Sequence, residues 1–227
     1  MKLTTAIEKL AAYYGQPARP KLKDPFELIL WELSAELASD EKRGAAFDAL
    51  KKNIGAKPQQ VFAAAPKDLV EVTKLGGMEP ERRARRMVDA ASLAVALFGG
   101  DLRKVLKLPL KDAKKALRKF PSVGEPLAEK ILMITHSYPV LSLESNGLRV
   151  LQRLGFAEAR KDYASSYRAM QEALTPQLPS DFDTLIAAHQ LLRRHGRELC
   201  KTARPLCGQC PLELDCPTVL RGANMSP

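Results

Sequence analysis

The sequence predicts an all-α protein, and three observations support this prediction. Apolar residues recur at intervals of three and four along most of the 227-residue chain, which is the period of an amphipathic helix. Alternating strand patterns bounded by turn residues are almost absent. Glycines and prolines stand where such helices would end or begin. The chain is 45% apolar, which is ample for a packed core.

The helices can be placed in chain order from these signals. The first carries its apolar stripe on Leu3, Ile7, Leu10 and Tyr14. The second begins after the capping residue Asp24, with Pro25 at its first position. Further helices are expected over Asp40 to Asn53, Pro66 to Leu75, Pro80 to Phe98, Leu110 to Lys119, Glu125 to His136, Ser145 to Leu154, Lys161 to Leu174 and Asp181 to His195. Most of them are expected to end at glycines, namely Gly55, Gly76, Gly99, Gly155 and Gly196.

Charge and hydropathy narrow the class of protein. Lys and Arg number 36 against 26 Asp and Glu, a formal net charge of +10, which attracts polyanions such as nucleic acid. A basic protein without such a partner has the same composition, so both interpretations stay open. The longest run of small and apolar residues, Ala90 to Phe98, is too short to cross a bilayer. The first residues lack a secretory pattern, so we expect a cytoplasmic protein without membrane association.

Four cysteines lie close together near the C-terminus, with spacing Cys-x6-Cys-x2-Cys-x5-Cys: Cys200, Cys207, Cys210 and Cys216. Without a secretory signal, disulfides are not expected, and thiolates this close together can surround one soft metal centre. Zinc sites usually use two close pairs of ligands, whereas only one close pair is present here. The spacing therefore favours a four-iron four-sulfur cluster, with zinc as the alternative. A redox protein using such a cluster also fits this pattern.

A short turn from Phe120 to Gly124 separates two expected helices. The backbone amides at the start of the second helix are unpaired, so Ser122, Val123 and Gly124 can hold a DNA phosphate without reading a base. Every pair of helices needs some connection, however, so the turn alone is a weak signal.

The helix before this turn carries a basic stripe. Its members are spaced to share one face of the helix: Lys111, Lys114, Lys115, Arg118 and Lys119. We interpret the stripe as a DNA-binding surface, and a solvated charged face is the alternative. Another basic run, Arg82, Arg83, Arg85 and Arg86, occupies several helical faces, so we assign it mostly to solubility.

Three segments together resemble the endonuclease III family of the helix-hairpin-helix DNA glycosylases. Asp24 to Asp40 is similar to the family's opening barrel helix. Phe120 to Gly124 is similar to its Leu-Pro-Gly-Val-Gly hairpin. His195-Gly196-Arg197 followed by the four cysteines is similar to its cluster loop, and this is the most specific of the three.

The resemblance implies two helical domains with the substrate in the cleft between them. Residues 24–139 would form a barrel domain with the hairpin, and residues 1–23 with 140–227 would form a domain with the iron-sulfur loop 200–216. The partner would be double-stranded DNA carrying damage, bound by a monomer. In this family the damaged nucleotide is flipped out, and a carboxylate stabilises the cationic sugar while the glycosidic bond breaks.

The sequence departs from the family pattern at the catalytic positions. Pro126 stands where bifunctional members carry the lysine that forms a Schiff base and cuts the strand. Glu144 stands in place of the catalytic aspartate, one methylene longer. Ser122 replaces the first hairpin glycine, and Leu37 replaces a glutamine that fills the space left by the flipped base.

These residues lead to one prediction and one alternative of another class. We predict a glycosylase that removes a damaged base with Glu144, monofunctional because Pro126 cannot act as the lyase nucleophile. Glu144 can also serve simply as a favourable charge at a helix start. Lys130, one turn beyond Pro126, is the one nearby substitute, although such a lysine more often faces solvent. The alternative is a non-catalytic protein that binds damaged or distorted duplex.

Overall fold

The computed structural model describes residues 1–222, and within them all regular structure is helical. The predicted all-α class is therefore confirmed. In this part of the chain the one bridge of strand type joins Glu36 and Gly77. None of the helices described is long and apolar enough to span a bilayer. The last residues of the predicted C-terminal domain, 223–227, lie outside the described part.

The chain divides into two compact units. One is the continuous segment Pro20–Ser137, and the other combines Met1–Arg19 with the chain from Tyr138 onward. The functional assignment of residues 24–139 to a barrel domain and of the remainder to a cluster domain stays a prediction.

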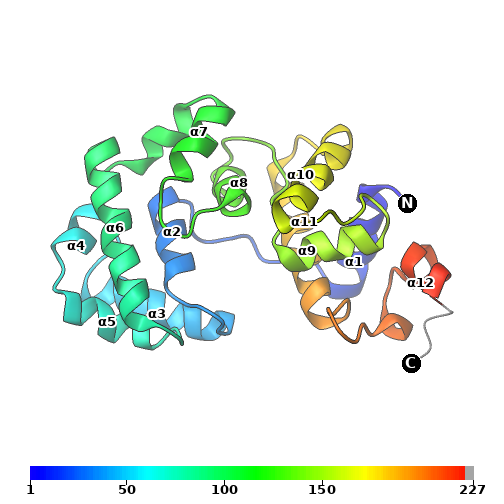
Figure 1. Ribbon diagram of the computed structural model, residues 1–227, viewed down its shortest axis with the longest axis horizontal. Coiled ribbons are helices and arrows are strands. Elements are labelled where there is room, and N and C mark those ends of the chain that lie inside the picture. The colour runs from blue at the N-terminus through cyan, green and yellow to red at the C-terminus, as the bar shows by residue number, and fades with distance from the viewer. Residues whose placement is uncertain (223–227) are drawn as a thin grey trace. The chain divides into compact units, whose positions relative to one another are not determined.

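The unit Pro20–Ser137 is built around one long helix. Its elements are α2 (Pro25–Leu33), α3 (Asp40–Asn53), α4 (Pro58–Ala63), α5 (Pro66–Lys74), α6 (Pro80–Phe98), η1 (Leu102–Lys107), α7 (Leu110–Leu117) and α8 (Glu125–Ile134). Helix α6 packs against α2, α4 and α5 (Figure 1). Asp24 caps α2 as predicted, because its carboxylate accepts hydrogen bonds from the amides of Phe26 and Glu27. Buried side chains such as Phe26, Leu30 and Met87 form the core.

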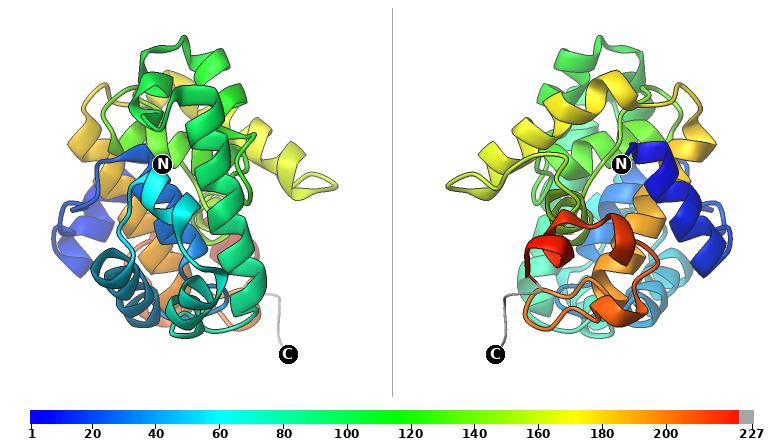
Figure 2. Two further views of the ribbon diagram at one scale, coloured as in Figure 1. Left: turned by 90° about the vertical axis from the view of Figure 1, so that its left-hand side faces the viewer. Right: turned by 90° about the vertical axis from the view of Figure 1, so that its right-hand side faces the viewer.

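The other unit brings the two chain ends together. Its elements are α1 (Leu3–Tyr14), α9 (Ser145–Arg153), α10 (Tyr163–Leu174), η2 (Thr175–Gln177), α11 (Phe182–Glu198), η3 (Cys207–Gln209), η4 (Glu213–Asp215) and α12 (Pro217–Gly222). Helix α11 contacts both α1 and α9, as Figure 2 shows from two sides. Leu10, Leu151 and Leu192 are fully buried, so the N-terminal helix shares one core with the C-terminal elements.

Two of the glycine assignments are wrong. Gly196 does not end α11, which continues to Glu198. It lies inside the helix, where an added Cβ would come within 2.7 Å of the Asn146 Cβ. Gly76 follows the C-cap Leu75 of α5 but lacks the left-handed φ of a capping glycine, and it packs against the Ser34 carbonyl instead. Both glycines permit close contact with another segment rather than a special backbone angle.

Candidate functional site

The four cysteines follow α11 in a loop with little regular structure. All four are free thiols, and Cys216 is the most buried of them. The Cys200 sulfur lies 3.3 Å from an Arg153 guanidinium nitrogen, and the Cys210 sulfur accepts from the Leu212 amide at 3.4 Å. Hydrogen bonds of this kind are typical of the sulfur ligands of metal centres.

The thiols lie close enough to affect one another electrostatically. Burial raises the pKa of Cys207, and the charges of Cys200 and Cys216 raise it further. Burial raises the pKa of Cys210 to about 11, although the Leu212 amide opposes the shift. Within residues 1–222, no group of three or more His, Cys, Asp or Glu side chains is arranged to hold a metal ion. Four thiols in one loop are nevertheless the donor type of a thiolate-bound centre.

His195 connects this loop to the N-terminal helix. It is 1% exposed, its Nε2 lies 3.5 Å from the Cys210 sulfur, and its Nδ1 lies 3.2 Å from the Tyr14 hydroxyl. Burial lowers the pKa of His195 to about 4, so the ring is neutral at physiological pH. Burial, reinforced by Glu198, raises the pKa of Tyr14 above its ordinary value. His195 is therefore a packed, neutral residue that contacts a cysteine directly.

Glu144 is the N-cap of α9, and its carboxylate is held by two donors. Oε1 accepts from the Gly147 amide at 2.8 Å, and Oε2 accepts from the Asn146 side-chain amide at 2.7 Å. The helix-start role expected as the alternative is thus present. An ionised carboxylate has about four acceptor positions, so two hydrogen bonds leave it able to accept others. Glu144 is half-buried, and capping does not prevent a chemical role.

The hairpin joins α7 to α8 as expected, and α8 begins at Glu125. Ser122 has φ of 63°, in the left-handed region where glycine is favoured. Val123 is buried and its amide bonds to the Phe120 carbonyl, so that amide is occupied within the turn. No side chain caps the N-terminus of α8, so its first-turn amides lack the acceptor that a capping side chain would supply.

The basic stripe on α7 is divided in the structure. Lys111, Lys115 and Lys119 are exposed. Lys114 is instead turned toward α8, where it pairs with Glu125 and, at 2.6 Å, with Glu129. The expectation that all five cations share one exposed face is therefore wrong for Lys114, because two carboxylates on the neighbouring helix draw it inward.

Lys130 is also paired with a carboxylate rather than exposed. Its Nζ lies 2.6 Å from Glu32 Oε1 on α2, and Arg43 on α3 binds the other oxygen of Glu32. Burial alone would raise the pKa of Glu32, but the charges of Lys130 and Arg43 outweigh it and lower the pKa to about 2. Pro126 lies in the first turn of α8. The sequence did not single out Glu32, although a charged residue among the apolar residues of α2 was a visible signal.

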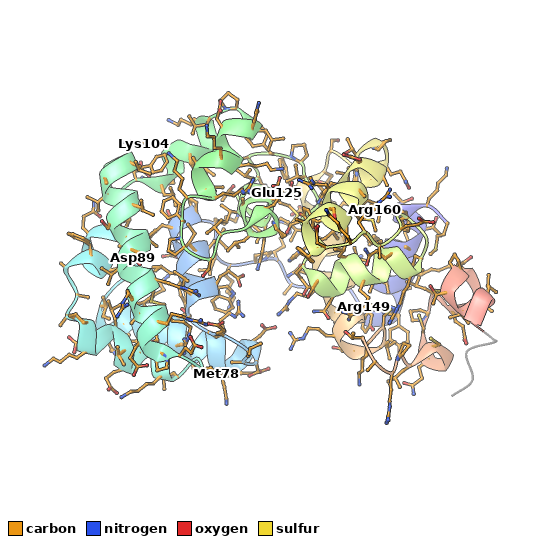
Figure 3. All side chains as sticks on the ribbon, in the orientation of Figure 1. Met78, Asp89, Lys104, Glu125, Arg149 and Arg160 are labelled. Atoms are coloured by element: carbon orange, nitrogen blue, oxygen red, sulfur yellow. The ribbon has the colours of Figure 1, made fainter. Side chains whose placement is uncertain are left out.

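Leu37 lies on a strained and exposed turn. It is 89% exposed and has φ of 50°, although leucine rarely adopts such an angle. The neighbouring turn exposes Met78, which is labelled in Figure 3. Arg83 fixes both turns, because its guanidinium donates to the carbonyls of Ser34, Thr73, Gly77 and Met78. Assigning Arg83 to solubility was wrong, since it is 1% exposed.

No family model matches the chain, but comparison with individual proteins gives consistent results. Over 212 residues the chain is 29% identical to endonuclease III of Thermotoga maritima, covering 92% of both proteins. It is 24% identical to a thymine-DNA glycosylase of Aeropyrum pernix, over 70% of this chain and 67% of that protein.

Solved structures with a similar fold are proteins of the same kind. A trapped endonuclease III–DNA covalent intermediate superposes with a TM-score of 0.75 at 20% identity, covering 97% of both chains. A thermostable thymine-DNA glycosylase superposes with a TM-score of 0.77 at 14% identity, covering 96% of this chain and 97% of that one. Taken with the hairpin and the cysteine loop, these results show that the chain is similar to endonuclease III proteins along most of its length and has the fold of the helix-hairpin-helix DNA glycosylases.

Proposed function

We propose that this protein is a DNA glycosylase of base excision repair that removes a damaged base by hydrolysis assisted by Glu144. The observation that carries the proposal is the Glu144 carboxylate at the start of α9, held by two hydrogen bonds. The family resemblance of the sequence around it gives Glu144 the role of the catalytic aspartate. The names of its curated relatives support the same reaction class, since they are endonuclease III and thymine-DNA glycosylase.

The chemistry requires a negative group beside a sugar that becomes cationic as the glycosidic bond breaks. A carboxylate that is already oriented stabilises this charge without reorganising during the reaction. Glu144 retains unused acceptor positions for an attacking water, and its half-buried position reduces competition from solvent. The damaged base itself must first leave the duplex, because its glycosidic bond is otherwise inaccessible.

Strand cleavage by a lysine is not part of the proposal. Pro126 has no side-chain amine, and the Lys130 Nζ lies 2.6 Å from Glu32 Oε1 in an ion pair. A Schiff base requires an amine that is free to attack the sugar, so this ion pair disfavours Lys130 as a nucleophile. We propose a monofunctional enzyme for this reason.

The DNA would be held by the hairpin and the exposed part of α7. The uncapped start of α8 offers amides to a phosphate, and Lys111, Lys115 and Lys119 add positive charge nearby on the preceding helix. Leu37 is exposed and apolar, which suits a side chain that enters the base stack where a nucleotide has been flipped out. The proposed partner is damaged double-stranded DNA, bound by a monomer.

We further propose that Cys200, Cys207, Cys210 and Cys216 hold a four-iron four-sulfur cluster, with zinc as the alternative. N–H groups directed at two of the sulfurs support thiolate ligation. The sequence spacing, with a single close pair of cysteines, favours a cluster over one zinc ion. Once bound, such a cluster would crosslink a loop that has little hydrophobic core of its own. Iron content and visible absorbance of protein purified without oxygen distinguish the two metals.

The test uses duplexes that each carry one lesion and scores base release separately from nicking. Base release is expected with at least one lesion, and Glu144→Gln should abolish it while duplex affinity stays within about twofold, because phosphate contacts do not involve this side chain. Nicking and borohydride trapping should be absent. Unchanged base release in Glu144→Gln would reject the assignment.

Non-catalytic recognition of damaged duplex is the second candidate, and Pro126 is the observation that favours it. It predicts tight binding to some lesion with no base release from any duplex in the panel. Because both candidates depend on phosphate contacts, affinity must fall steeply with added salt in either case.

A further inference from the structure

We infer that Asn146 and Arg149 are positioning residues that connect the Glu144 carboxylate to the cysteine loop. The inference rests on the proposed function of Glu144 and extends it to two residues on the same helix. Neither residue was a candidate from the sequence, and both act through contacts that the structure shows within one compact unit.

The connection is a continuous series of hydrogen bonds. The Asn146 side-chain Nδ2 donates to Glu144 Oε2 at 2.7 Å, and the Asn146 side-chain Oδ1 accepts from Arg149 Nη2 at 2.8 Å. Arg149 Nη2 also donates to the Gly196 carbonyl at 2.7 Å, and its Nε donates to the Cys200 carbonyl at 3.0 Å. The chain of contacts therefore runs from the carboxylate to the backbone of the first cysteine. Figure 3 labels Arg149 on α9.

Arginine is well suited to this place because its planar guanidinium presents donors in fixed directions. One nitrogen serves Asn146 and Gly196 while another serves Cys200, and a lysine could not reproduce this geometry. Gly196 gives independent support, because its missing side chain lets α11 approach Asn146 closely. An added Cβ would lie 2.7 Å from the Asn146 carbonyl oxygen.

The connection matters because Glu144 has one more rotatable bond than the aspartate it replaces. The Gly147 amide holds only Oε1 of the Glu144 carboxylate, so without Asn146 the carboxylate group could rotate about that single hydrogen bond. A misplacement of about 1 Å can reduce a rate by roughly 100-fold. Asn146 fixes the orientation of the carboxylate, and Arg149 fixes Asn146 against the cysteine loop.

The experiment compares Asn146→Ala, Arg149→Gln and wild-type protein carrying its metal centre. We expect single-turnover base release to slow by about 10- to 100-fold in both variants, because the carboxylate loses its orientation. Duplex affinity should stay within about twofold, since neither side chain belongs to the proposed phosphate contacts. The Gly147 amide, which bonds directly to Glu144, should exchange its hydrogen several-fold faster in both variants.

Arg153 provides the matched control. It lies one turn further along α9 and donates to the Cys200 sulfur and to the carbonyls of Lys201 and Thr202, without a hydrogen bond to Asn146. Arg153→Gln should loosen the loop and lower metal retention, while Gly147 exchange stays near the wild-type value. Faster Gly147 exchange in Arg149→Gln but not in Arg153→Gln supports positioning.

Two outcomes would overturn the inference. One is a Gly147 amide that exchanges its hydrogen at the wild-type rate in Asn146→Ala. This variant keeps the contacts of Arg149 with the cysteine loop, so it tests the connection even if Arg149→Gln does not fold. The other is equal acceleration in Arg153→Gln, which would indicate general loosening. Gly147 exchange is measured without turnover, so it decides the inference even if Glu144→Gln shows that the proposed reaction is wrong.

Discussion

Replacing Glu32 by glutamine tests the ion pairs that Glu32 forms with Lys130 on α8 and Arg43 on α3. The pKa of Glu32 falls from 4.5 to about 2 in the folded protein, which corresponds to about 3 kcal/mol of stabilisation at neutral pH. When folding lowers the pKa of a carboxylate, the carboxylate stabilises the folded state in full at pH values above its pKa in the unfolded chain. This contribution is lost as the pH falls through its pKa in the folded protein. The contribution should therefore be complete at pH 7, roughly halved at pH 3 and nearly absent below pH 2.

The assay is urea unfolding of wild-type protein and Glu32→Gln at pH 7 and pH 3. We expect the variant to lose about 3 kcal/mol at pH 7 and about half of that at pH 3. Adding Lys130→Met to Glu32→Gln should recover part of the loss, because the remaining lysine charge would otherwise be half-buried without its carboxylate. Equal losses at both pH values, or a loss below about 1 kcal/mol at pH 7, would refute the electrostatic argument.

Four further changes give separate tests. Ser122→Gly should raise the melting temperature by about 2 °C. The left-handed backbone of Ser122 costs about 1 kcal/mol that glycine would not pay, although the greater backbone freedom of glycine in the unfolded chain offsets part of this gain. Glu125→Gln should free Arg118, an exposed member of the basic stripe that pairs with Glu125 at 3.2 Å, while Lys114 keeps Glu129. Duplex binding should strengthen, with a salt dependence about one charge steeper in a titration. Gly196→Ala should cost about 1–3 kcal/mol in chemical denaturation, because its Cβ would collide with Asn146. Tyr14→Phe should cost about 1–2 kcal/mol in the same assay, since His195 Nδ1 loses its partner in a buried position.

The sequence predicted much of the fold because helix signals are local. Asp24 caps α2, and α3 and α6 begin and end at the residues expected. The short helix Pro58–Ala63 was missed, because six residues are too few to show a period. Gly196 was misassigned for a different reason: its function is contact with Asn146, a residue distant in sequence, and no local pattern reports such a contact.

Residues of the candidate site could be predicted only where they belong to a short contiguous sequence motif. The cysteine spacing and the hairpin are contiguous in sequence, so their residues could be named. Ion pairs between helices are not, which is why Lys114 was expected to face solvent and Glu32 was not considered. Arg83 shows the same limit, because its carbonyl partners come from two turns brought together only by folding.

Helix α9 explains why a loop at the end of the chain can influence a carboxylate more than 50 residues earlier. Its nine residues span about 13 Å as one rigid element, with Glu144 at its start and Arg153 in its last turn. Arg149 and Arg153 both bind the loop that begins at Cys200, so ordering that loop also orders the helix. A metal held by the cysteines would then support the geometry at Glu144 without contacting a substrate. Such a role would explain why the proposed metal serves a hydrolysis that needs no electron transfer.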